Sequence, residues 1–474
     1  MRTPRFVVVC ASAIGLLASL SPVRGENLQQ AWSIALGVNQ QVQSQQAESV
    51  AAGLNLAAAR SARLPSLRSY TFNAFLTASP EVSTRSFFGT SATGGAAAGL
   101  AGTTITNSLP AAVPVLGPGQ RDLPISIAYA SLPLYTGGRI LRNIDAAGAQ
   151  VGVQRSEEFR TVLDLKLTVA ESYIGVLRAR KNLEVARSNV AQLDSFARDV
   201  RNRREQGLAI RSDELAALVS LANARLSLIQ ARTSLEAAWA TLNRYLCRPP
   251  AQVVELDELT VFPATTDWKK LAEQALEDTS APEAGNEDEV RELTQRAFRA
   301  RPELVGLAEQ ARSLAAQADA TRAGVLPQAG FTMAYAFIGN NNLTPQGIGA
   351  ASFYLDWTIT DGGASRRRAA ALRQQEFAAH KHRADTAADV ALQVRTRWLD
   401  LKQARRRLPV AHLTIDQAEE NVKVVTDRYR QQLSTYTEVL DAESRRVQSL
   451  TNYYNAVYDE SLALFRLRRA VGDL

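Results

Sequence analysis

The sequence predicts a mainly helical protein that carries a few membrane-type β-strands and is built from two copies of one unit. Three observations support this fold class. Residues 137–246 align with residues 362–471 without a gap. Four short segments alternate apolar with small or polar residues, as strands do. Helical segments of about 70 residues carry apolar side chains every seven positions, as coiled coils do.

The two copies are related by two constant shifts, which is the mark of an internal repeat. Gly137-Gly138 corresponds to Gly362-Gly363 at a shift of 225 residues. Earlier in each copy, Leu64-Pro65 corresponds to Leu326-Pro327 at a shift of 262. The shift changes because the stretch between the Leu-Pro and Gly-Gly marks is longer in the first copy. Each copy therefore contains a helix, a variable stretch and a long helical pair, in that order.

The first 25 residues resemble a secretory signal peptide. Arg2 and Arg5 precede an apolar run at 6–20 that is too short to span a bilayer. Small residues follow, and we expect cleavage after Gly25. The rest of the chain is then expected to divide into a first repeat at 26–262, an acidic connector at 263–289 and a second repeat at 290–474.

Composition and reactive residues argue against an enzyme. The net charge of +7 falls to +4 after the expected cleavage, because three Lys or Arg residues and no acid precede Glu26, and so weak and dispersed a charge does not indicate nucleic acid as a partner. Cys247 is the only cysteine after the signal peptide, and alone it forms neither an internal disulfide nor a metal site. His380 and His382 are two positions apart on an expected helix, where they do not share a face. We expect no catalytic residue, no metal and no cofactor.

Four segments are expected to cross a bilayer as strands, at about residues 66–78, 122–136, 328–338 and 351–361. Their lengths are close to the 9–11 residues that a tilted transmembrane strand needs. Because each pairs an aromatic or branched face with a small or polar one, the pattern fits lipid on one side and water on the other. A half-buried hairpin of a soluble protein is the alternative. The residues predicted to face lipid are Tyr70, Phe72, Ile125, Ile127, Phe331, Tyr335, Phe353 and Trp357.

Long helices are expected at 139–206, 212–246, 363–432 and 437–471. In the first of them, Val162, Val169 and Val176 begin a series that repeats every seven residues, which indicates coiled-coil packing. Gly207 is a helix stop, and Ser212 and Thr437 are the expected N-caps of the helices that follow. Pro409 lies inside the third helix, where a bend is expected.

Together these features resemble the TolC family of outer-membrane efflux proteins. The residues that carry the resemblance are Ala35-Leu36, Ala297-Phe298, the two Leu-Pro and two Gly-Gly pairs, and the segment Leu355–Gly363 (LDWTITDGG), which is similar to the family's passage from strand into helix. The resemblance covers nearly all of the chain after the signal peptide. It implies a homotrimer in which each chain gives four strands to a 12-stranded β-barrel, continued by a long α-helical coiled-coil barrel. It also implies an outer-membrane position with the helices in the periplasm, and as partners a periplasmic adaptor (membrane fusion protein), an inner-membrane transporter and outer-membrane lipid.

The resemblance further implies roles for the helix tips. Tyr429, Glu438 and Asp441 stand where the family places its periplasmic entrance gate, and three copies of the acids would form rings that select against anions. Ordinary solvated acids at a helix start are the alternative. Ser434 stands where the best-known member has an Arg that helps to lock the gate, so the lock must differ. The tip residues implied to contact the adaptor are Gly207, Leu208, Ser212, Asp213, Leu433, Ser434 and Thr437.

Three questions stay open at the level of sequence. The insertion at about 79–121 forms either an extracellular loop or a plug in the barrel mouth. Arg366–Arg368 either contacts lipid headgroups or is a solvated helix start. The rival function, from another class, is a periplasmic coiled-coil scaffold or adaptor without a pore.

Overall fold

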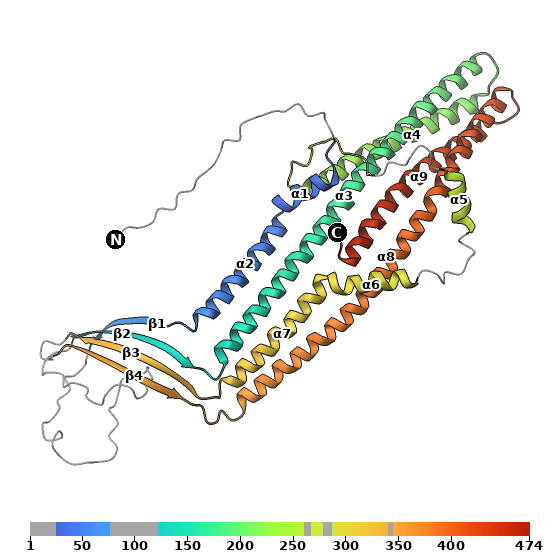
Figure 1. Cartoon of the computed structure of the whole chain (residues 1–474). Helices are drawn as coiled ribbons and strands as arrows, with labels where there is room; N and C mark the ends of the chain where they lie inside the picture. Colours follow the sequence, from blue (N-terminus) through green and yellow to red (C-terminus); the bar gives the residue numbers. More distant parts are fainter. Residues whose placement is uncertain (1–24, 76–121, 260–266, 278–286, 340–344) are drawn as a thin grey trace, which may run out of the picture. The chain divides into compact units, whose positions relative to one another are not determined.

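The computed structural model of the protein describes residues 25–75, 122–259, 267–277, 287–339 and 345–474. Residues 1–24 of the expected signal peptide and the whole 79–121 insertion lie outside these ranges. Within them the chain forms long helices and one four-stranded antiparallel sheet, which confirms the mainly helical fold class (Figure 1). None of the described helices is both long enough and apolar enough to cross a membrane.

The order of elements repeats the order expected from the sequence. In chain order they are α1 (Leu28–Val38), α2 (Gln40–Ser61), β1 (Ser66–Phe75), β2 (Asp122–Tyr135), α3 (Arg139–Glu205), α4 (Arg211–Tyr245), α5 (Trp268–Glu277), α6 (Glu287–Ala300), α7 (Pro302–Ala323), β3 (Gln328–Ile338), β4 (Gly347–Asp356), α8 (Ala364–Arg430) and α9 (Tyr436–Val471). Helix α5 lies within the expected connector, and α6 begins before the expected start of the second repeat. Helix α8 is continuous through Pro409.

The chain divides into two compact units, which α3 and α8 both enter. One unit comprises residues 40–162 and 291–394 and holds the sheet. Small buried residues on α7 pack between its helices, and polar contacts join them as well. Ser313 on α7 donates to the carbonyl of Ala146 on α3 at 3.1 Å, and Arg373 on α8 pairs with Asp319 on α7 at 2.7 Å. These contacts hold the helices that lead into and out of the strands.

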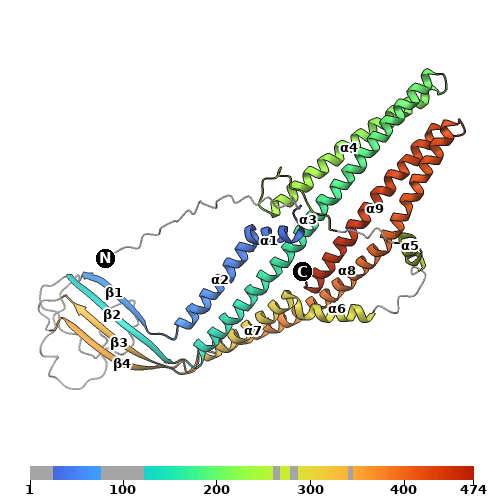
Figure 2. The same cartoon turned by 45° about the horizontal axis from the view of Figure 1, so that its top comes forward.

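The sheet has the strand order β1-β2-β3-β4, so β1 and β4 form its two edges (Figure 2). Tyr70 lies opposite Ile127, and Ile127 lies opposite Ala336. Residues directly opposite one another point to the same face of a sheet, whereas successive residues point to opposite faces. Tyr335 is therefore on the other face from Ile127. Phe331 and its partner Phe353 share the face of Tyr335.

This register corrects the prediction that the eight residues expected to face lipid all lie on one side of the sheet. One face, called the Ile127 face below, carries Tyr70, Phe72, Ile125 and Ile127. The opposite face, called the Phe331 face, carries Phe331, Tyr335 and Phe353. The alternation within a strand predicts which residues share a face of that strand. It does not predict how two strands are paired, and the β2–β3 pairing places the aromatic residues of the two copies on opposite faces.

The fourth strand lies earlier in the chain than predicted. It spans Gly347–Asp356, not 351–361, so Trp357 follows the strand. The Gly-rich start of β4 has weak strand propensity, but its backbone pairs with β3 from Gly347 opposite Phe337. Its last residue, Asp356, lies opposite Gln328, the first residue of β3. Beyond Asp356 the chain has no strand partner among the described residues of the protomer.

The Gly-Gly pairs adopt the same conformation in both copies. Gly137 and Gly138 have φ of 61° and 86°, and Gly362 and Gly363 have φ of 65° and 81°. Two successive residues at positive φ favour glycine, because side chains with a Cβ are strained there. In the second copy Asp361 then accepts from the backbone N–H groups of Gly363 and Ser365 and caps α8. The pairs therefore turn each outgoing strand into a long helix.

The second unit comprises residues 163–290, 395–474 and the described residues up to Asn39. Its core includes the seven-residue series of α3, in which Val169 and Val176 are fully buried. Tyr173 on the same helix donates to the carbonyls of Glu26 and Asp257, each at 2.7 Å. Ion pairs join α3 to α9, including Arg178 with Asp459 at 2.6 Å. Helices α8 and α9 form a hairpin in this unit (Figure 2).

Candidate functional site at the helix tips

The two helical hairpins of the second unit pack against one another near their tips. A buried apolar cluster joins α3 and α4 to the start of α9, and Tyr436 and Val439 are the α9 residues in it. Their partners on α3 and α4 are Leu193, Ala197, Val200, Ala217, Leu221 and Ala224. Half of these partners are alanine, which lets the helices approach closely. The expected site residues therefore lie on a packed four-helix end.

The turn at each tip has the same geometry in the two copies. Gly207 has φ of 75° and Gln432 has φ of 61°, and the following N–H groups of Leu208 and Leu433 donate to carbonyls five residues back, each at 2.8 Å. This is a Schellman-type helix end, in which a left-handed residue favours glycine. The sequence predicted the stop at Gly207, but Gln432 gives no such signal. Leu208 and Leu433 are 54% and 64% exposed at corresponding positions.

The two predicted N-caps are wrong. Ile210 is the residue before α4, and it gives no side-chain cap, while Ser212 is the second residue of the helix. Acidic residues in the first turn, Asp213 and Glu214, favour this uncapped start through the helix dipole. In the second copy Thr435, not Thr437, caps α9. Thr435 and Glu438 have the spacing of a capping box, which was readable in the sequence.

Tyr429 lies between the two hairpins. Its ring is 5.5 Å from that of Tyr436, and the guanidinium of Arg203 on α3 lies 5.6 Å from its centre. Arg203 also donates to the carbonyl of Arg430 at 3.5 Å and to the carboxylate of Asp199 at 3.1 Å. Burial raises the pKa of the Tyr429 hydroxyl, and Asp213 nearby raises it further. Arg203 thus ties the end of α3 to the end of α8.

Glu438 and Asp441 are both exposed, and each has a local partner. Glu438 accepts hydrogen bonds from the Ser434 hydroxyl at 2.7 Å and from the Thr435 hydroxyl at 3.1 Å. These bonds, with that from the Thr435 N–H, lower the pKa of the Glu438 carboxyl. Asp441 pairs with Arg445 one turn later at 2.9 Å. The Ser434 hydroxyl therefore orders an acid at the tip.

Sequence reasoning missed two buried acids near the tips. Glu214 pairs with Arg201 at 3.4 Å and with Arg204 at 3.1 Å, which joins the start of α4 to the end of α3. Glu443 on α9 is 1% exposed and forms two hydrogen bonds with Arg446. The i, i+3 spacing of Glu443 and Arg446 was visible in the sequence. Their burial was not, because acids at these spacings usually occupy a solvated helix face.

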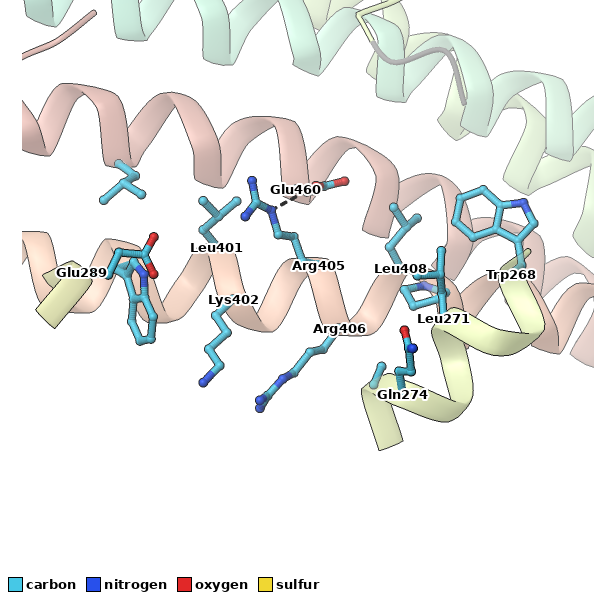
Figure 3. Close-up of a pocket in the computed structure, with 14 residues that line it drawn as sticks. Trp268, Leu271, Gln274, Glu289, Leu401, Lys402, Arg405, Arg406, Leu408 and Glu460 are labelled. Atoms are coloured by element: carbon cyan, nitrogen blue, oxygen red, sulfur yellow. Dashed lines mark ion pairs between the residues drawn. The ribbon is translucent and has the colours of Figure 1, made fainter. Parts of the chain in front are cut away.

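A pocket of about 480 Å³ lies elsewhere in the same unit, between α5, α8 and α9. Figure 3 shows Arg405 extending toward Glu460, with which it pairs at 3.5 Å, and Leu271 and Trp268 of α5 at one end. Near it, His412 stacks on Trp268 at 4.5 Å, and burial lowers the pKa of the imidazole. The pocket contains none of the predicted site residues. No group of side chains in the described ranges is arranged to hold a metal ion.

Comparison with known proteins agrees with this architecture. The model of a protein family described as outer membrane efflux protein matches residues 125–248 and 293–473. No curated protein sequence is a significant match. Among solved structures, the outer membrane protein VceC from Vibrio cholerae is 15% identical with a TM-score of 0.72, over 94% of this chain and 96% of that one. The CmeC outer membrane channel of Campylobacter jejuni is 13% identical with a TM-score of 0.72, over 95% and 86%. The open MtrE outer membrane channel of Neisseria gonorrhoeae is 15% identical with a TM-score of 0.69, over 99% and 97%. These structures share the fold.

Proposed function

Because the chain belongs to the outer membrane efflux protein family, we propose that it is the exit duct of a tripartite efflux or secretion system. In this proposal it receives substrates from an inner-membrane transporter and a periplasmic adaptor and releases them outside the cell. The family is one of outer-membrane channels and not of enzymes. The observation that carries the proposal is the four-stranded sheet of the described residues, which has two free edges there and apolar side chains on both faces.

Four strands do not close a barrel, since the smallest bacterial barrels use eight. Open edges are not tolerated in hydrocarbon, because their backbone groups find no hydrogen-bond partners there. Three copies would supply twelve strands and leave no edge. The helices that continue from the strands through the Gly-Gly pairs would then line a duct in the periplasm, with seven-residue packing between neighbours.

We assign the Phe331 face to lipid and the Ile127 face to the lumen. In β3 and β4, Met333, Tyr335 and Phe353 on the Phe331 face are 54%, 54% and 78% exposed. The alternate residues Ala334, Ala336 and Ala350 are only half-exposed. Side chains crowd on the concave side of a curved sheet, so the Ile127 face is the inner one. Arg68 and Asp356 also share that face, and a charge facing hydrocarbon is unfavourable.

Thiol accessibility tests this assignment in a Cys247→Ser background, since Cys247 is exposed. Ile127→Cys should react with a charged, water-soluble thiol reagent in the assembled protein. Tyr335→Cys, which lies opposite Ala128 next to Ile127 but points to the other face, should resist it. The opposite order of reactivity would exchange the two faces.

The tips are assigned to the gate and to the adaptor. Tyr429, Glu438 and Asp441 form the periplasmic entrance. The stacking of Arg203 on Tyr429 links the ends of α3 and α8 and replaces the locking contact that an Arg at position 434 would make. Leu208 and Leu433 are exposed apolar residues at equivalent positions of the two turns, so a single partner could contact both hairpins through them. The remaining tip residues, Gly207, Ser212, Asp213, Ser434 and Thr437, complete this surface.

The test is planar-bilayer conductance of the detergent-purified oligomer. Discrete, cation-selective openings are expected. Replacing Glu438 and Asp441 together with Ala should change conductance and reduce cation selectivity. Glu420→Ala, which removes an exposed acid farther along α8, is the matched control. A protein that is soluble without detergent and gives no openings would favour the rival function, a periplasmic scaffold without a pore.

A further inference from the structure

The two free edges of the sheet are related by the internal repeat. Strand β4 corresponds to β2 at a shift of 225 residues, and β1 corresponds to β3 at a shift of 262. The pairing of β2 with β3 inside one chain is therefore a template for the pairing of β4 of one protomer with β1 of the neighbouring protomer. Since β2 and β3 are antiparallel, the pairing between copies is antiparallel as well.

The template gives a register. Within the chain, Tyr129 lies opposite Ala334 and Ser131 lies opposite Thr332. Replacing each residue by its counterpart puts Tyr354 opposite Phe72 and Asp356 opposite Tyr70. On the basis of the proposed trimeric channel, we propose that neighbouring protomers join through β4 and β1 in this register, with Asp356 of one protomer opposite Tyr70 of the next.

The point at which β4 ends supports this register. Strand β2 continues for four residues past Ser131, the last of its residues that pairs with β1, and Leu132, Pro133 and Tyr135 in this extension pair with β3. The counterpart of Ser131 is Asp356, where β4 stops. The next four residues, 357–360, continue the strand alternation of the sequence, yet Trp357 and Ile359 are 55% and 81% exposed and belong to no strand. A neighbouring β1 supplies the backbone partner that these four residues lack.

The same register brings opposite charges together. Arg68 is two residues from Tyr70 on β1 and shares its face. A residue two positions from the direct partner lies about 7–8 Å away across the ladder, within reach of a long side chain. In the single chain Arg68 donates to the Tyr129 hydroxyl at 3.5 Å, and Asp356 has no ion pair among the described residues. Arg68 of one protomer therefore pairs with Asp356 of its neighbour at each seam, that is, at each β4–β1 junction between protomers.

Disulfide cross-linking tests the register in the full-length Cys247→Ser protein. Tyr70→Cys is combined with Asp356→Cys, and in a second variant Thr71→Cys is combined with Leu355→Cys. Consecutive pairs alternate between the two ladder geometries, so together they sample both. Under mild oxidation at least one pair should give covalent dimers and trimers on a denaturing gel. The control, Asp356→Cys with Ala74→Cys, is displaced by four residues on the same face and should give neither.

The outcomes separate the seam from the channel. Cross-linking of the displaced control, or of no pair in a protein that is trimeric by mass, overturns the register and leaves the proposed channel intact. A detergent-solubilised monomer overturns both. For the charges, Arg68→Asp should lower the temperature at which the oligomer dissociates, and adding Asp356→Arg should restore it. A further loss in the double variant overturns the ion pair.

Discussion

Tyr436 offers a sharp test of the packing at the tips. It is the first residue of α9 and is 3% exposed within the cluster that joins the two hairpins. Its hydroxyl is buried without a hydrogen-bond partner in the described part of the chain, and burial strongly raises its pKa. An unsatisfied buried hydroxyl costs about 1–3 kcal/mol. Tyr436→Phe keeps the ring and removes that cost, so it should stabilise the tips by about 1 kcal/mol.

Two further variants provide reference values for the expected change in stability. Tyr436→Ala removes the ring as well and should destabilise the tips by about 3–5 kcal/mol, the range for large aromatic truncations. Tyr458 is the matched control, because it lies on the same helix and is 2% exposed, but its hydroxyl donates to Glu258 at 3.1 Å. Tyr458→Phe should therefore destabilise its surroundings by about 1.5–3 kcal/mol, as expected for a bond to a charged group.

Hydrogen exchange of the α9 and α4 peptides measures these changes locally. One to two kcal/mol corresponds to a factor of about 5–30 in an opening equilibrium. Exchange near Tyr436 should slow by about fivefold in Tyr436→Phe and quicken by more than about 100-fold in Tyr436→Ala. If Tyr436→Phe quickened exchange as Tyr458→Phe does, the hydroxyl would have a partner in the assembled protein, and the reasoning from its burial would be refuted.

Three other predictions concern α9 and the Gly-Gly turn before α3. Arg446→Leu leaves Glu443 charged and buried, so it should lower the free energy of unfolding by about 3–5 kcal/mol, and thermal unfolding should show a larger loss than for the exposed pair variant Arg445→Leu. The pKa of Glu438 is lowered in the folded state, so its cap of α9 is present above the usual carboxyl pKa and is lost as the pH falls through the lowered value; Ser434→Ala should move that loss to higher pH, as followed by hydrogen exchange of the first turn. Gly138→Ala forces a side chain to φ of 86° and should cost about 1–2 kcal/mol in thermal stability, whereas Gly148→Ala, inside α3, should not.

Much of the fold followed from periodicity in the sequence. The seven-residue series predicted the buried side of α3, where Val169 and Val176 are fully buried. The repeat located both Gly-Gly turns, because two residues at positive φ need glycine whatever surrounds them. Such features depend on local chemistry, and local chemistry is what a sequence states directly.

Features that depend on distant partners were predicted less well. The faces of the sheet required the β2–β3 register, although the repeat held a signal, since at a shift of 262 Phe331 corresponds to Ser69 and not to Tyr70. The start of β4 depends on a ladder with β3 and not on the propensity of Gly347 and Gly349. At the tips, the cap at Thr435 was readable from Glu438 three residues on. The burial of Tyr436 was not, because its neighbours come from α3 and α4.

The open edges β1 and β4 also bear on how the protein is made. A lone copy presents two rows of unpaired backbone groups and apolar side chains on both faces, which is a template for pairing with any exposed strand. In the proposed trimer, its correct partner is another copy, so productive folding depends on concentration and competes with aggregation. Biogenesis would then require a holding chaperone in the periplasm and would join assembly to membrane insertion. Depleting such a chaperone should reduce the amount of channel without changing the channels that do form.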